Sequence, residues 1–284
     1  MGLQHAREWI AGTTVNYLVY HFLTQEPQIL QEYQFIVVPI VNPDGYNYSW
    51  TSDRLWRKNR NPNTGGAGVG VDLNRNYNTH WGEGGSSSDS TSDIFMGTSP
   101  ASELEVQAVS KYFLEWPNIV AAFDFHSFSQ LIMRPYGWTP QDSDLEPFLS
   151  AAGSAMAAAI QGVRGTVYES MKSYDLYVTT GSAGDWFYDD TVKSKFGRRV
   201  FSFDVELYPS QTGNGFVVPV EEIEPCGQEI AAGMKAFIEY ISKNNPSTSS
   251  LVTSSAGRWG DRAGISQTLW GLLPVLAVFC LYFG

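Results

Sequence analysis

The chain has 284 residues, of which 43% are hydrophobic and 14% aromatic, a composition that suits a folded core and excludes a disordered chain. Its formal net charge of −11 would repel phosphate backbones, so nucleic acid is not expected as a partner. Two cysteines, Cys226 and Cys280, are too few for a disulfide framework or a cysteine-rich zinc module.

Patterns typical of a helix, a strand and a long loop follow one another in the first third of the chain. Residues 7–24 carry apolar side chains at helical spacing. The apolar run over residues 33–41 indicates a buried strand, and the Asn-Pro-Asp-Gly sequence at 42–45 predicts a turn after it. Residues 46–81 have no regular pattern, and an irregular segment of this length in a compact domain is usually functional.

Helices and strands continue to alternate through the rest of the chain. A helix is predicted over residues 99–116, where Ser99 and Pro100 start it. Further elements are predicted as strands at 119–125, 130–135 and 200–207 and as helices at 145–163 and 220–244. This alternation predicts an α/β fold, in which a mixed, mostly parallel twisted sheet carries helices on both faces.

Two side chains suited to acid–base or metal chemistry fall at the ends of predicted strands. His126 directly follows the strand at 119–125, and Glu206 lies near the end of the strand at 200–207. In open sheets of this kind the active site lies at the carboxyl ends of strands, where the loops gather. We therefore expect His126 and Glu206 to lie close together.

The segment His5-Ala6-Arg7-Glu8-Trp9 is the clearest candidate for metal binding. His5 and Glu8 are three positions apart, so a turn or a first helical turn can aim both side chains at one point. An imidazole and a carboxylate are two of the three protein ligands of a His₂Glu zinc site, which keeps a fourth position open for water. His126 is the candidate third ligand. Taken by itself, this spacing is more typical of a solvated helix face.

Glu206 is the candidate base for such a site, because a carboxylate is the usual group that takes a proton from water at a catalytic metal. A strand alternates its sides, so Glu206 and Asp204 share one side while Phe203 and Val205 share the other. An acid among apolar neighbours is costly to bury unless it is paired or functional. The alternative is a glutamate on an edge strand that faces water.

Basic residues are concentrated in the long irregular segment of an otherwise acidic chain. The planar fork of an arginine matches a carboxylate through two hydrogen bonds, so these side chains could bind the charged end of a substrate. The alternative is a solvated basic loop. The residues concerned are Arg54, Arg57, Lys58, Arg60 and Arg75.

Eight segments, in the same order, resemble the zinc metallocarboxypeptidases of the carboxypeptidase A/B type. They lie within residues 1–243, and each bears on the same site. The segments are QHAREW (4–9), NPDGY (42–46), RLWRKNR (54–60), GVDLNRNY (70–77), FHSFSQ (125–130), PYG (135–137), LYVTTGSAGDW (176–186) and FDVEL (203–207).

The resemblance implies one Zn²⁺ per chain and a role for each matching residue in the chemistry. His5, Glu8 and His126 match the zinc ligands, and Asp72 matches the carboxylate that orients the first of these histidines. Glu206 matches the general base. Arg57 matches the residue that polarises the scissile carbonyl and stabilises the oxyanion.

The resemblance also implies a site for the C-terminal end of a peptide or protein substrate. Asn74 and Arg75 match the pair that binds the terminal carboxylate. Tyr177 matches the tyrosine that closes over that end, and Arg7 matches a residue of the outer subsites.

The residue that matches the bottom of the family's side-chain pocket is Gly184. Without an acid at this position a buried lysine or arginine side chain would lack a counter-ion, and we therefore expect a preference for large apolar or aromatic C-terminal residues. Lys172 matches another pocket position and could instead favour acidic residues. Phe128 stands where the family usually has tyrosine, which removes a hydroxyl from an outer subsite.

In the family several strands and a helix precede the zinc motif. We therefore expect the chain to be N-terminally incomplete, its sheet to lack the first strands, and the missing part to have carried a secretion signal. Residues 1–244 would be the catalytic domain, 245–268 a linker and spacer rich in Ser, Thr and Gly, and 269–284 a hydrophobic tail.

The C-terminal tail carries no charge and is shorter than the roughly 20 apolar residues that span a membrane. Small residues at 253–257, a polar spacer at 257–268 and this tail follow one another as in the signal for a GPI anchor. The alternative is a tail that itself anchors in the membrane. We expect an extracellular protein, secreted or anchored at the cell surface, that is a monomer and meets a membrane only through this tail.

Two other functions compete with a carboxypeptidase. A catalytically impaired family member could act as a cell-surface peptide-binding protein, although such a protein would be expected to have lost the base or a zinc ligand. A related zinc hydrolase, such as a deacylase of small amides, is the other alternative, against which the Asn74-Arg75, Tyr177 and Gly184-Asp185-Trp186 segments argue.

Overall fold

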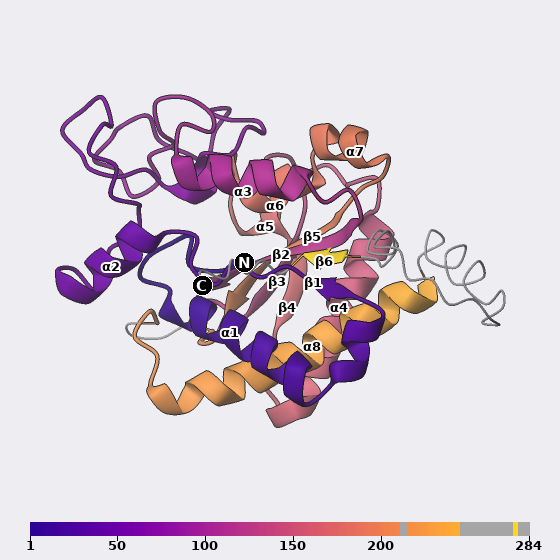
Figure 1. Cartoon of the computed structure of the whole chain (residues 1–284). Helices are drawn as coiled ribbons and strands as arrows, with labels where there is room; N and C mark the ends of the chain where they lie inside the picture. Colours follow the sequence, from indigo (N-terminus) through magenta and orange to yellow (C-terminus); the bar gives the residue numbers. More distant parts are fainter. Residues whose placement is uncertain (211–214, 245–274, 278–284) are drawn as a thin grey trace, which may run out of the picture.

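The sheet at the centre of the protein has six strands in the order β1-β6-β2-β5-β3-β4. The computed structural model describes residues 1–210, 215–244 and 275–277 (Figure 1). All neighbouring strands are parallel except β3 and β5, so the predicted mixed, mostly parallel sheet is confirmed. The strands are β1 Gln34–Phe35, β2 Ile119–Ser127, β3 Leu131–Arg134, β4 Glu169–Lys172, β5 Phe201–Leu207 and β6 Val275–Ala277.

Helices cover both faces of this sheet. On one face α1 (Trp9–Thr24), α4 (Glu146–Arg164) and α8 (Ile223–Asn244) pack together over the strands (Figure 1). On the other face lie α3 (Leu104–Leu114), α5 (Ser173–Leu176), α6 (Ala183–Tyr188) and α7 (Asp190–Phe196). The remaining helical segments are α2 (Pro43–Thr51) and the short 3₁₀ turns η1 (Pro27–Gln31), η2 (Leu73–Arg75) and η3 (Val220–Glu222).

The alternating side chains of the central strands build one apolar core on each face. Phe123, Phe125 and Phe203 pack against α1, α4 and α8, with Phe237 of α8 edge-on to Phe123 at 5.0 Å between ring centroids. On the opposite face Phe113 of α3 packs against Phe187 of α6 at 4.6 Å. Burial on both faces explains why β2 reads as an almost continuous apolar run.

The longer predicted elements are confirmed, with two exceptions. The helix predicted over 99–116 does not start at Ser99 and Pro100, because α3 begins at Leu104 with Glu103 at its N-cap. The segment around residue 42 also differs. The predicted strand over residues 33–41 is reduced to β1, and the predicted turn is instead the start of α2. The Asn42 side chain accepts a hydrogen bond from the Gly45 backbone N–H at 2.9 Å, and Pro43 occupies the first helical turn. Asn followed by Pro is a helix N-cap signature as well as a turn signature, and here the helix forms.

The register of β2 and β5 brings the two strand-end residues together as expected. The strands are parallel neighbours in which His126 lies opposite Glu206 and Asp124 lies opposite Asp204. Strand β5 is flanked by β2 and β3, so Glu206 is not on an edge strand. The alternative of a solvent-facing edge glutamate is therefore wrong.

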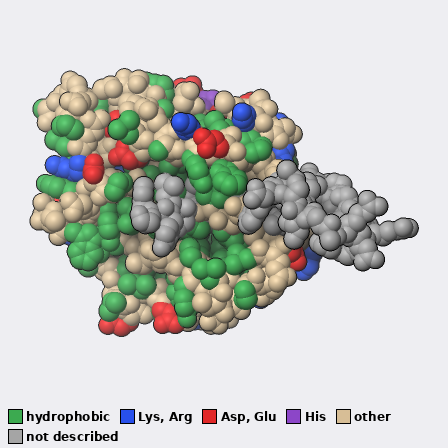
Figure 2. Space-filling model, viewed as in Figure 1, with side chains coloured by type: hydrophobic (Ala, Val, Ile, Leu, Met, Phe, Trp, Pro, Cys, Tyr) green, Lys and Arg blue, Asp and Glu red, His purple; other side chains and the backbone are tan. Residues whose placement is uncertain are grey.

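The predicted linker and most of the predicted C-terminal tail lie outside the described residues. Val275–Ala277 are described, and their backbone pairs with β1 and β2 as β6. Within residues 1–210, 215–244 and 275–277, no helix combines the length and the apolar character needed to cross a membrane. On the face shown in Figure 2, Lys and Arg side chains are scattered among apolar and neutral ones rather than gathered in a patch.

Candidate active site

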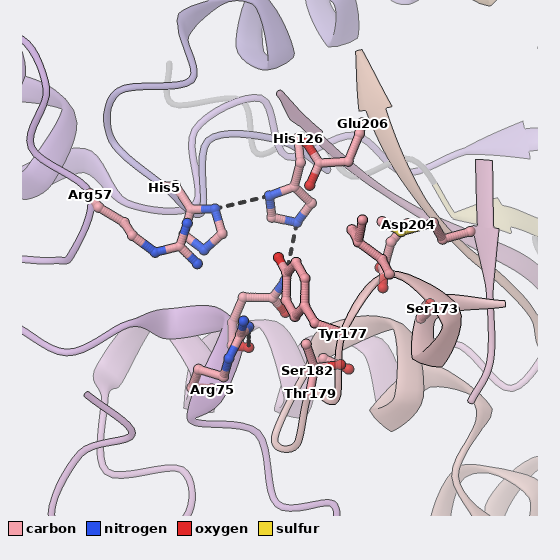
Figure 3. Close-up of a pocket in the computed structure, with 13 residues that line it drawn as sticks. His5, Arg57, Arg75, His126, Ser173, Tyr177, Thr179, Ser182, Asp204 and Glu206 are labelled. Carbon is pink, nitrogen blue, oxygen red and sulfur yellow. Dashed lines mark hydrogen bonds between the residues drawn. The ribbon is translucent and has the colours of Figure 1, made fainter. Parts of the chain in front are cut away.

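The three predicted metal ligands converge, although they come from two distant segments. His5 and Glu8 lie in the turn that leads into α1, and His126 lies near the end of β2. Glu8 Oε1 is 2.8 Å from His5 Nδ1, and Glu8 Oε2 is 2.9 Å from His126 Nδ1. The two Nδ1 atoms are 3.1 Å apart, a contact drawn as a dashed line in Figure 3. All three side chains are buried, and their ligand atoms form a cluster able to hold a metal ion.

A buried carboxylate holds the outer nitrogen of each histidine. His5 Nε2 is 3.0 Å from Asp72 Oδ1, and His126 Nε2 is 2.6 Å from Asp124 Oδ2. When each Nε2 carries the proton and donates it to its carboxylate, each Nδ1 is left with a lone pair that faces the other histidine and Glu8. Such lone pairs repel one another unless a cation lies between them.

This donor set fits zinc. Tetrahedral coordination with zinc–nitrogen bonds of about 2.0–2.1 Å places neighbouring ligand atoms about 3.3 Å apart, close to the spacing of the two Nδ1 atoms. The cluster is two histidines and one glutamate, the set of a catalytic zinc site with an open position. Burial lowers the pKa of His126, but the Asp124 and Glu8 carboxylates raise it by more, so the pKa lies well above its usual value. The surroundings of His126 therefore favour positive charge.

Asp124 is a functional candidate that the sequence reasoning missed. Its side chain is fully buried, and it lies two residues before His126 on β2. Strand alternation places residues two apart on the same side, so the pattern contained the signal. Asp72, in contrast, is found where it was expected.

Arg57 lies beside the metal ligands and is held by Asp72. Its Nε and one Nη donate hydrogen bonds of 3.1 and 2.8 Å to Asp72 Oδ2, and its other Nη is 3.9 Å from Glu8 Oε1. Burial lowers the pKa of the guanidinium, but Asp72 and Glu8 raise it by more, so Arg57 stays charged. The same pairing holds the pKa of the buried Asp72 well below its usual value.

A hollow opens next to this cluster and collects most of the predicted site residues. Figure 3 shows the labelled side chains around it. Glu206 lies beside His126, and its buried Oε2 has no hydrogen-bond partner among the described residues. Burial, reinforced by the Glu8 carboxylate, raises the pKa of Glu206 to about 8. The lining residues are His5, Arg57, Asn74, Arg75, His126, Met133, Ser173, Leu176, Tyr177, Thr179, Ser182, Asp204 and Glu206.

Asn74 and Arg75 are buried in η2, and both line this hollow. The Asn74 side-chain oxygen accepts a hydrogen bond of 2.8 Å from the Ala183 N–H. Arg75 is fixed by bonds from Nε to the Gly85 carbonyl and from Nη1 to the Asn74 carbonyl, at 3.0 and 2.7 Å. These bonds orient a guanidinium that still faces the hollow.

Tyr177 and Arg7 lie further out. Tyr177 is 53% exposed at the rim, and it shares an adjoining hollow with Arg7, Arg57 and Arg75. Arg7 stacks over Phe216 at 4.3 Å and donates to the Leu55 carbonyl at 3.3 Å. The structure therefore brings every predicted binding residue except Gly184 to one of these two hollows.

Gly184 is buried and is not among the residues that line the hollow, and an acid lies directly beside it. A Cβ added at Gly184 would lie 2.6 Å from Asp204 Cγ, so the Asp204 carboxylate occupies the space that a side chain at 184 would take. Lys172, the alternative pocket cation, donates to the Pro140 carbonyl and to Asp142 Oδ1 at 2.8 and 3.0 Å, away from the lining residues. Phe128 packs edge-on against Phe216 at 5.0 Å.

Comparisons with known proteins agree with this geometry. The family model described as zinc carboxypeptidase matches residues 1–233. A carboxypeptidase B of Astacus astacus is 38% identical over 244 residues, which are 84% of this chain and 78% of that protein. Human carboxypeptidase O is 36% identical and covers 89% of this chain and 68% of its own length. The solved structure of bovine thrombin-activatable fibrinolysis inhibitor in complex with tick carboxypeptidase inhibitor aligns with a TM-score of 0.79 at 34% identity, covering 86% of this chain and 82% of that one.

Proposed function

The chain belongs to the zinc carboxypeptidase family, whose members are metallocarboxypeptidases that use one Zn²⁺, and we propose how its own side chains bind and cleave a substrate. The proposal is that His5, Glu8 and His126 hold the zinc and that the protein releases the last residue of a peptide or protein. One observation carries it: the two-histidine, one-glutamate cluster lies next to Glu206, whose buried Oε2 has no partner among the described residues, at a hollow that a buried Arg75 also lines.

Glu206 is the general base of this proposal. Zinc bound at this cluster supplies a Lewis acid and lowers the pKa of a coordinated water towards about 7. A bound cation would also lower the pKa of a nearby carboxylate, so Glu206, whose pKa burial raises to about 8 in the protein alone, would be more readily ionised near neutral pH. Its free Oε2 then accepts the proton of the attacking water and passes it to the leaving amine.

Arg57 stabilises the negative charge that develops on the scissile carbonyl oxygen. Its guanidinium is oriented in advance by the two hydrogen bonds to Asp72 and stays charged. A charged donor held in place before the reaction is usually among the largest contributions to catalysis.

Arg75 and Asn74 restrict cleavage to the end of a chain. A guanidinium binds a carboxylate through two hydrogen bonds, and an internal peptide bond offers no such group. Tyr177, exposed at the rim, covers the bound end, and Arg7 contacts residues further from the terminus.

Three variants test this assignment. Glu206→Gln should retain zinc and lose almost all release of C-terminal residues, and Arg75→Gln should lose exopeptidase activity through a raised KM. Glu32→Gln, an exposed residue far from the hollow, is the matched control for the first. Zinc is measured by elemental analysis and product by amino-acid analysis. A zinc-loaded wild-type protein that binds C-terminal peptides without cleaving them would favour the alternative, a peptide-binding family member.

The place where the protein acts is proposed on the sequence pattern alone. We infer an extracellular protein, proposed to be a monomer, that is anchored through its C-terminal tail, since small residues, a polar spacer and an apolar segment follow one another after residue 253. Anchoring requires Val275–Ala277, which pair with β1 and β2 as β6, to leave the sheet. Release from intact cells by a phosphatidylinositol-specific phospholipase supports a GPI anchor. Release only by detergent contradicts it.

A further inference from the structure

Asp204 is an acid of the hollow to which the proposed chemistry gives no role. It lies on β5 two residues before Glu206 and therefore on the same side of the strand. Its side chain is 8% exposed and lines the hollow, and its Oδ1 has no hydrogen-bond partner among the described residues. A buried carboxylate without a partner is costly, so its presence calls for a group that pairs with it.

Among the described residues that line the hollow, no lysine or arginine lies on the side of Asp204. Figure 3 shows Asp204 and Ser173 on the opposite side of the hollow from Arg57 and Arg75, which are the two lysine or arginine side chains among its lining residues. Burial and the nearby Asp124 raise the pKa of Asp204 well above its usual value, while His126 acts in the opposite direction. Met133, which pairs with Asp204 across β3 and β5, and Ser182 complete a wall without charge.

Gly184 makes this arrangement possible. The Asp204 carboxylate packs directly against the Gly184 Cα, where any side chain would overlap it. An acid on β5 and a glycine on α6 thus form one unit: the glycine leaves the space into which the acid projects. The lack of an acid at position 184 therefore does not leave the pocket without negative charge.

We propose that this hollow binds the side chain of a lysine or arginine at the C-terminus of the substrate, and that Asp204 is its counter-ion. The inference rests on the proposed function, because Arg75 and Asn74 bind the terminal carboxylate and so direct the last side chain towards Asp204. An ammonium or guanidinium there gives Oδ1 its missing hydrogen bond. An acidic side chain would meet a like charge, and an apolar one would leave the carboxylate unpaired.

Peptides that differ only in their last residue test this preference. With zinc-loaded protein, kcat/KM is measured for substrates that end in Arg, Lys, citrulline, Phe and Glu. Citrulline keeps the shape of arginine without its charge. We expect kcat/KM for the substrates ending in Arg and Lys to exceed that for the substrates ending in citrulline and Phe by about 30-fold or more. This factor corresponds to the lower end of the free-energy cost of leaving one member of a buried charge pair unpaired. In the Asp204→Asn protein, the ratio of kcat/KM for the Arg-ending substrate to that for the citrulline-ending substrate should fall to near one.

A binding measurement makes the test independent of turnover. Acetyl-arginine and acetyl-citrulline are titrated by NMR into zinc-loaded Glu206→Gln protein with Asp204 intact or changed to Asn. Tighter binding of acetyl-arginine that disappears in the Asp204→Asn protein supports the proposal. Equal binding of the two compounds, or fastest cleavage of Phe- or Glu-ending peptides, overturns it. If acetyl-arginine binds through Asp204 but no peptide is cleaved, the proposed catalytic function fails and the pocket assignment stands.

Discussion

The carboxylate of Asp124 should control how tightly the protein holds zinc. Its Oδ2 accepts the His126 Nε2 proton at 2.6 Å, and the two side chains are 0% and 2% exposed. Asp124→Asn keeps the shape and an acceptor oxygen but removes the charge that holds the imidazole with Nδ1 free for the metal. We expect zinc affinity to fall by about 10–100-fold, the usual effect of losing an outer partner of a metal-binding histidine, or about 1.4–2.7 kcal/mol.

The assay is competition for zinc with a chromogenic chelator at fixed pH, followed by kcat/KM at saturating zinc. Asp53→Asn is the matched control, because Asp53 is exposed and its side chain accepts a hydrogen bond from the Leu55 N–H at 2.9 Å. The control should stay within about twofold of the wild type, as surface substitutions usually do. Urea unfolding of the metal-free proteins separates a loss of affinity from a loss of fold.

A folded Asp124→Asn protein that holds zinc as tightly as the wild type would refute the reasoning. The short His126–Asp124 contact would then be a packing feature without influence on the metal. A loss of affinity equal to that of the Asp53→Asn control would lead to the same conclusion.

Three further results are expected. Arg57→Lys should lower kcat by about 100-fold with zinc content unchanged, because lysine cannot make the paired bonds to Asp72 that orient the guanidinium; unchanged kcat would remove Arg57 from the mechanism. Burial raises the pKa of Asp185 to about 6, so the stability it contributes is complete below pH about 4 and is lost as the pH rises through 6. In urea unfolding at pH 4 to 7, Asp185→Asn should remove this pH dependence, which amounts to about 3 kcal/mol in the free energy of unfolding. Parallel curves of unfolding free energy against pH for the wild type and the variant would contradict it. Phe237→Ala should cost about 3–5 kcal/mol in the same assay, since the ring is fully buried among Phe123 and Phe203, and Val163→Ala on the exposed side of α4 should cost far less.

The sequence was sufficient for the elements and residues that follow a strong periodic pattern. The long helices and the buried strands β2 and β5 were predicted to within a few residues. His126 and Glu206 could be placed together because parallel strands bring their carboxyl ends to one edge, and the observed register puts them opposite each other. Local spacing likewise predicted the convergence of His5 and Glu8.

What the sequence did not reveal depended on choices between two local signals or on contacts across the fold. The Asn-Pro pair at residue 42 satisfies both a turn and a helix N-cap, and only tertiary context selects the helix. The segment with β4, α5, α6 and α7 consists of elements too short to show a period. The acid beside position 184 was not found for a third reason: position 184 was considered alone, whereas Asp204, which fills its space, comes from β5, 20 residues further along the chain.

The charges around the hollow link the metal to the substrate preference. The acids Glu8, Asp72, Asp124, Asp204 and Glu206 outnumber the two arginines, Arg57 and Arg75, that line the same region. Glu8, Asp72 and Asp124 surround His5 and His126, so a divalent cation bound between these histidines would relieve the repulsion among the three carboxylates. Asp204 lies two residues before Glu206 on β5, and its buried Oδ1 has no hydrogen-bond partner among the described residues. In the inference above, the C-terminal side chain of the substrate brings a second positive charge to the far end of the hollow, where it pairs with Asp204.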